Sequence, residues 1–224
     1  MTNILAFFAH PDDEVNCAGL MHKNFNEGGN NLVICFTSNK KRLEELKESC
    51  AIIGAELLVL DFKGLDIKYS KSLRTKLKKI IVRYKPDIAI IQANDYHPDH
   101  RSVHQIAFDT LTFVSHGDEK YSWFTPIILE AEATGLITYP DVIVNIDAEQ
   151  EVRRKAFSAH QSQVQSKSFG DAYIRTLEEK AKLRGAQIGC VYGEAYKRHL
   201  IPIKGDFYYK NRGIQSVVDL VCLK

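Results

Sequence analysis

The chain has 224 residues, enough for one sizeable domain, and its 45% hydrophobic and 26% charged residues are ordinary for a globular protein. The net charge of +2 at pH 7 provides no general basic field, which argues against nucleic acid as a partner. No apolar stretch approaches the ~20 residues that cross a bilayer, so we expect no membrane span.

The N-terminus and the cysteines bear on the cellular compartment. Residues 1–8 lack a basic leader and reach His10 too early for a signal peptide, so they predict a first strand. The five cysteines form no CxxC pair and are odd in number, which disfavours a disulfide framework or a cysteine zinc site. We therefore expect a cytoplasmic protein with reduced thiols.

The first half of the chain alternates apolar runs with amphipathic segments. We predict strands over 3–8, 32–36, 56–60 and 87–91, and helices over 15–26, 41–53, 70–84 and 99–114. This order predicts an α/β, Rossmann-like fold with a mostly parallel sheet and helices on both faces. The common doubly wound strand order, 3-2-1-4, places the first strand beside the fourth.

The second half is less regular. We predict strands over 127–132 and 142–146, helices over 149–161 and 171–186, and a tail from Gly189 that packs over the sheet. We find no repeat and no low-complexity linker, so we expect a single domain over 1–224.

Two histidine-carboxylate clusters follow the first and fourth predicted strands. One is AHPDDE at 9–14 and the other is HPDHR at 97–101. The carboxyl ends of neighbouring parallel strands meet at one edge of a sheet, where such folds bind ligands. Imidazole and carboxylate groups together suit zinc or another divalent transition metal, so we predict a metal site at the carboxyl ends of strands 1 and 4.

The residue types also suggest separate roles. His10, Asp13 and His100 form a two-histidine, one-carboxylate set, which leaves a metal position open for a water whose pKa falls to ~7. Asp12 can act as general base. His97, as an imidazolium, can stabilise an oxyanion or protonate a leaving amine.

Three further residues are candidates at this stage. Asp99 or Glu14 can orient the ligand imidazoles from a second layer. His104 lies four residues after His100 on a predicted helix, a spacing that metal pairs use, so it is an alternative ligand.

The two clusters resemble the signatures of the LmbE-like, PIG-L-type N-deacetylases. Residues 145–147 with 155–163, and residues 184–196, resemble two later segments of that family, so the resemblance covers nearly the whole chain. It implies a Rossmann-like fold, a metal site that is usually zinc, and removal of N-acetyl groups from N-acetylglucosamine-type sugar conjugates.

The resemblance also implies residue roles. It makes His10, Asp13 and His100 the metal ligands, Asp12 the general base and His97 the electrostatic or acid partner.

For the substrate the resemblance gives three candidates. Arg42 would contact anionic or hydroxyl groups, Tyr96 lies where relatives often place an oxyanion tyrosine, and His160 would face the substrate, lie in a second layer or pack between helices. Many relatives carry a longer, glycine-containing loop where this chain has only residues 37–40, which leaves the substrate open.

We therefore expect a zinc-dependent amidohydrolase that removes an N-acetyl group from an N-acetylglucosamine-type conjugate by means of a metal-activated water. Its partner would be this small molecule, and the sequence is compatible with a homo-oligomer. The short loop at 37–40 motivates a non-sugar acylated amine as the alternative substrate. A catalytically silent metal-binding subunit would not need Asp12, and a dinucleotide-binding oxidoreductase is disfavoured because the turn after the first strand lacks GxGxxG.

Overall fold

A computed structural model describes residues 1–116, 121–166 and 170–201. They form one seven-stranded sheet with the order β3-β2-β1-β4-β5-β7-β6. The strands are β1 (Asn3–Phe8), β2 (Asn30–Thr37), β3 (Glu56–Phe62), β4 (Ile88–Ile91), β5 (Ile127–Ala131), β6 (Val142–Asn145) and β7 (Gly193–His199). The helices are the 3-10 helix η1 (Asp13–Cys17), α1 (Ala18–Asn26), α2 (Lys40–Ile53), α3 (Lys71–Tyr84), α4 (Pro98–Ser115), α5 (Gln150–Ala159), α6 (Gln161–Val164) and α7 (Gly170–Ile188).

The predicted mostly parallel sheet and the order 3-2-1-4 are confirmed. β1 pairs in parallel with both β2 and β4, β2 with β3, and β4 with β5. Part of the tail differs from the prediction, because Gly193–His199 enters the sheet as an antiparallel strand between β5 and β6 instead of packing over it. The rest of the predicted tail, residues 202–224, lies outside the described residues. The helix predicted over 15–26 is divided into η1 and α1.

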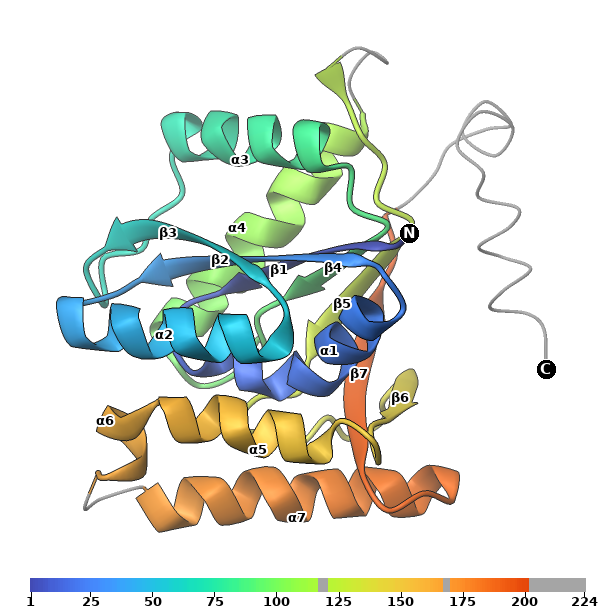
Figure 1. The fold of residues 1–224 in the computed structure, drawn as a ribbon. Helices are drawn as coiled ribbons and strands as arrows, with labels where there is room; N and C mark the ends of the chain where they lie inside the picture. Colours follow the sequence, from blue (N-terminus) through green and yellow to red (C-terminus); the bar gives the residue numbers. More distant parts are fainter. Residues whose placement is uncertain (117–120, 167–169, 202–224) are drawn as a thin grey trace.

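Helices cover both faces of the sheet, and the alternation of side chains along β1 shows how. Leu5 and Phe7 point into the cluster that includes residues of α3 and α4. Ile4, Ala6 and Phe8 point into the opposite cluster with residues of α1, α2 and α5. All five side chains are buried, as a central strand requires when helices cover both faces. Figure 1 shows the two helical layers on either side of the sheet.

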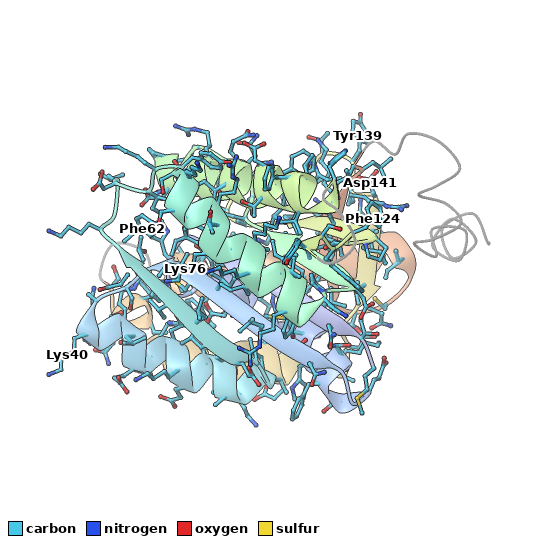
Figure 2. The ribbon with its side chains drawn as sticks, turned by 90° about the horizontal axis from the view of Figure 1, so that it is seen from above. Lys40, Phe62, Lys76, Phe124, Tyr139 and Asp141 are labelled. Atoms are coloured by element: carbon cyan, nitrogen blue, oxygen red, sulfur yellow. The ribbon has the colours of Figure 1, made fainter. Side chains whose placement is uncertain are left out.

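The parallel strands β1 to β5 carry their carboxyl ends to one end of the molecule. Viewed from above in Figure 2, Phe62 at the end of β3 and Lys40 at the start of α2 lie at one end, and Phe124 and Asp141 lie toward the other. Asn39 caps α2, because its side chain accepts a hydrogen bond of 3.1 Å from the amide of Arg42. Arg42 is therefore fixed in the first turn of α2, beside the loop that follows β1. Among the described residues, no helix is both long and apolar enough to cross a membrane.

Candidate metal and active site

The loop after β1 is held by both neighbouring strands. The amide of Ala9 donates to Oε1 of Gln92, which follows β4, at 3.1 Å. The carbonyl of Ala9 accepts from the amide of Thr37 at 2.9 Å and from its hydroxyl at 2.7 Å, at the end of β2. These bonds fix the peptide just before His10 and bring the two histidine-carboxylate clusters together at the carboxyl edge of the sheet.

His10, Asp13 and His100 converge with the spacing of metal ligands. Nδ1 of His10 lies 3.6 Å from Oδ2 of Asp13, and Nε2 of His100 lies 3.5 Å from Oδ1 of the same carboxylate. Ligand atoms that lie about 2.0–2.2 Å from a tetrahedral zinc ion are about 3.3–3.5 Å from one another. The donor types fit a divalent transition metal, and the two distances, which run to different oxygens of Asp13, are close to this spacing.

Both histidines have their remaining ring nitrogen occupied by a carboxylate. Nε2 of His10 lies 2.9 Å from Oδ2 of Asp99, and Nδ1 of His100 lies 2.8 Å from Oδ2 of Asp95. A carboxylate accepts, so in a neutral ring each of these nitrogens carries the proton, which leaves the lone pairs on Nδ1 of His10 and Nε2 of His100. These are the two atoms that face Asp13.

Asp95 was not among the sequence candidates. Its backbone lies in the loop between β4 and α4, and its side chain is 11% exposed. Oδ1 of Asp95 also accepts from the amide of His97 at 2.9 Å, so the Asp95 carboxylate that bonds His100 is fixed to the start of α4. The only signal in the sequence is a carboxylate five residues before His100.

His97 lies at the N-terminus of α4, where its Nδ1 accepts a hydrogen bond of 3.2 Å from the amide of Asp99. Burial and the neighbouring rings of His10 and His100 lower the pKa of His97. The lowered pKa favours the neutral imidazole over the imidazolium considered from the sequence, and the bond from Asp99 places the proton of a neutral ring on Nε2. One ring nitrogen from each of the three histidines lies within 4.8 Å of the others.

Asp12 has an unusual backbone and a pKa suited to proton transfer. Its φ is 102°, in the left-handed region that non-glycine residues rarely adopt. Burial, followed by the nearby carboxylate of Asp13, raises the pKa of Asp12 to about 7, although the charge of Arg42 opposes this rise. Nη2 of Arg42 donates to Oδ1 of Asp12 at 2.8 Å and also to the carbonyl of Pro11. Arg42 therefore contacts the carboxylate of Asp12, and its predicted contact with the substrate stays a prediction.

Glu14 and His160 form a buried pair behind Asp12. Oε1 of Glu14 lies 2.5 Å from both Nε2 of His160 and the hydroxyl of Ser49. Oε2 of Glu14 accepts from the amide of Asp12 at 2.9 Å. Glu14 therefore braces the backbone of Asp12 and not a ligand imidazole. His160 has no exposed surface and its side chain contacts Glu14, so of the three predicted alternatives the structure favours a position behind the site over direct contact with a substrate.

The rim of the site contains apolar surface. Tyr96 is 72% exposed, and its ring centroid lies 6.3 Å from that of His97. Leu65, in the loop after β3, is 73% exposed, and its amide donates to the carboxylate of Asp99 at 3.0 Å. Tyr96 is thus close to the cluster and accessible.

Comparison with known proteins finds a family match over the first half of the chain. Residues 5–111 match the family described as PIG-L, GlcNAc-PI de-N-acetylase, and this span contains both histidine-carboxylate clusters. None of the curated protein sequences matches the chain.

Solved structures share the fold over most of the chain. An N,N'-diacetylchitobiose deacetylase from Pyrococcus horikoshii has a TM-score of 0.75 and 21% identity, covering 96% of this chain and 88% of that chain. A conserved protein from Thermus thermophilus has a TM-score of 0.79 and 19% identity, covering 92% and 99%. A 4-carboxy-2-hydroxymuconate hydratase from Pseudomonas putida has a TM-score of 0.78 and 15% identity, covering 92% and 99%. Because one of these neighbours is a hydratase, the fold alone does not name the reaction.

The match over residues 5–111 and the shared fold confirm the predicted resemblance: this part of the chain matches the PIG-L-type, LmbE-like deacetylase family.

Proposed function

We propose that the protein is a zinc-dependent N-deacetylase that removes an acetyl group from an N-acetylglucosamine-type sugar conjugate. The observation that carries the proposal is the shared geometry of His10, Asp13 and His100, whose ring nitrogens lie 3.6 and 3.5 Å from one carboxylate. Asp99 and Asp95 hold the opposite side of each ring, as carboxylates do for metal-ligating histidines.

In this proposal Nδ1 of His10, the carboxylate of Asp13 and Nε2 of His100 hold the metal. The metal, when bound, supplies a Lewis acid that acidifies a water molecule and polarises the amide carbonyl. The three side chains come from one turn and one helix at the same sheet edge, so the set needs little rearrangement to bind.

Asp12 is the proposed general base. A group with a pKa of about 7 can take a proton from the attacking water and later return it to the leaving amine near neutral pH. Arg42 holds Oδ1 of Asp12, so the second carboxylate oxygen remains for proton transfer. Glu14 fixes the amide of Asp12 and so maintains the direction of the carboxylate.

His97 is the proposed donor to the oxygen of the reacting amide. Its Nδ1 accepts from the backbone, so Nε2 carries the hydrogen that can stabilise negative charge as the tetrahedral intermediate forms. The lowered pKa of His97 favours this role over protonation of the amine.

The sugar substrate rests on the family match and on the described activities of the neighbours. The family is described by its action on GlcNAc-PI, and one neighbour is a deacetylase of N,N'-diacetylchitobiose. The exposed Tyr96 beside His97 offers a ring face on which a sugar or an apolar aglycone can pack. A non-sugar acylated amine is the second candidate, because the loop between Thr37 and Lys40 is short.

An acetate-release screen tests the proposal. Metal-free protein is loaded with one equivalent of zinc and given N-acetylglucosamine conjugates, acetylated non-sugar amines and an unsaturated carboxylic acid that can be hydrated. We expect acetate and free amino sugar from the conjugates, with no release after chelation. Acetate release only from the non-sugar amines would show that the substrate is a non-sugar acylated amine. Hydration without acetate release would refute the proposed reaction. Higher zinc concentrations are tested too, because a neighbouring teicoplanin deacetylase is described in a zinc-inhibited form.

A further inference from the structure

A second group of potential metal ligands lies apart from the site described above. His104 on α4, Glu130 on β5 and His199 on β7 each offer one ligand atom, and these atoms lie within 4.8 Å of one another. In the described parts of the chain, this group and the one formed by His10, His97 and His100 are the two that meet this spacing. We propose that His104, Glu130 and His199 form a second binding site for zinc or a similar divalent transition metal.

The fold explains why these three side chains meet. His199 pairs with Ile128 across the antiparallel β5–β7 ladder, so it points to the same face as Ile128 and, two residues on, Glu130. Ile128 packs in the cluster that contains the residues of α4, so all three strand side chains face that helix. The ring of His199 lies over α4, 5.3 Å from the ring of His104 and 5.4 Å from that of Phe108.

The hydrogen bonds leave ligand atoms available. Nδ1 of His104 lies 4.0 Å from Oε2 of Glu130 and donates to the carbonyl of Gln92 at 2.9 Å. A metal bound through Nδ1 would replace this hydrogen bond, whereas Nε2 keeps a free lone pair while the bond is intact. Oε1 of Glu130 accepts from the amide of Asn94 at 2.9 Å, whereas Oε2 lies 2.8 Å from Nε2 of His199. A cation bound between them would replace the proton of that hydrogen bond and release it to solvent.

The donor set suits zinc. Two imidazoles and one carboxylate form a common set in zinc sites with an open position. Oε2 of Glu130 and Nε2 of His199 lie 2.8 Å apart, so these two atoms need to separate only slightly to reach the about 3.3–3.5 Å expected around a tetrahedral ion. The exposed fractions of the three side chains are 11%, 12% and 20%, so the group is held firmly yet still reaches solvent through His199.

This second site would be coupled to the first by the loop between β4 and α4. Gln92 and Asn94, which bond His104 and Glu130, lie just before Asp95 and His97. A cation at the second site would therefore stabilise the loop that supports the ring of His100. The proposal does not depend on the deacetylase reaction, since it concerns binding alone.

Zinc stoichiometry of the full, untagged chain tests the proposal. The protein is freed of metal by chelation, saturated with Zn²⁺, passed through a desalting column and analysed for zinc. We expect two ions per chain in the wild type, and one in both H199Q and H104Q. H100A should also retain one, and H100A/H199Q should retain none. H22Q is the matched control, because His22 on α1 belongs to neither group, and it should keep both ions.

Two further readouts keep the result interpretable. Circular dichroism establishes that each variant is folded, and the melting temperature should rise on the second equivalent of zinc in the wild type but not in H199Q. One ion in both the wild type and H199Q, or two ions in both H199Q and H104Q, would overturn the second site. Two ions in H100A, with one in H199Q and H104Q, would support the second site and contradict the first, so the two proposals can fail separately.

Discussion

The carboxylate of Asp95 lies 2.8 Å from Nδ1 of His100 and fixes the ring so that Nε2 points toward Asp13. Both side chains belong to the segment between β4 and the first turn of α4. The relationship gives His100 one tautomer and one orientation before any metal binds, and Asp99 does the same for His10.

Replacement of Asp95 by alanine should weaken metal binding while leaving the ligands in place. Outer partners of metal-ligating histidines typically contribute about 10–100-fold in metal affinity. Competition against a chromophoric chelator measures this change. Asp109→Ala is the control, because Asp109 lies on α4 more than two turns from His100, and it should leave the metal affinity unchanged. Equal affinities for both variants would show that Asp95 does not orient His100.

Asp12→Asn should separate metal binding from turnover. The amide keeps the size of the side chain and its contact with Arg42 but cannot take a proton, so we expect kcat to fall about 10²–10⁴-fold. The zinc content, measured on the same preparation, should match that of the wild type. If Asp12→Asn turned over substrate near the wild-type rate, Asp12 would not be the general base.

The pH dependence of kcat/KM should show one acidic limb. Asp12 is active only when ionised, and burial raises its pKa to about 7. Activity should therefore be full above this pKa and fall about tenfold for each pH unit below it. Rates measured from pH 8 to pH 5 give the profile, and the residual activity of Asp12→Asn should lack the limb. A flat wild-type profile over this range contradicts the assignment.

Glu14→Ala should destabilise the protein. It removes the carboxylate that bonds His160, Ser49 and the amide of Asp12, and none of the Glu14 or His160 surface is exposed. Loss of one partner of a buried charged pair costs about 3–5 kcal/mol of unfolding free energy. Urea unfolding measures the change. Glu44→Ala is the control, because Glu44 forms an exposed pair with Lys47 that contributes about 0–1 kcal/mol.

The parallel half of the fold could be predicted because its signals are local. Apolar runs, caps such as Asn39 and terminators such as Gly54 mark the elements between β1 and α4, and the doubly wound order follows from their alternation. The strand β7 was missed because its sequence, Gly193–His199, contains only one aliphatic residue and is held by its pairing with β5 and β6. Long-range pairing overrode a weak local pattern there.

The site could be predicted in its ligand types but not in its supporting contacts. Spacing brought His10 and His100 to one sheet edge, and the structure places them around Asp13. Asp12 is bonded by two residues, Arg42 and Glu14. These contacts require the left-handed turn at Asp12 and the close approach of α2 and α5, which no local sequence pattern encodes. The buried position of His160 likewise depends on the packing of α5 and could not be predicted from the local sequence.

The most direct test of the central claim is acetate and free amine released from one N-acetylglucosamine conjugate, compared between zinc-loaded wild type and zinc-loaded His100→Ala. His100 supplies one of the three proposed ligand atoms, so we predict equal amounts of acetate and amine from the wild type and neither from the variant or after chelation. Release at the same rate by the variant, or by the chelated wild type, would contradict a metal-dependent deacetylase built on His10, Asp13 and His100.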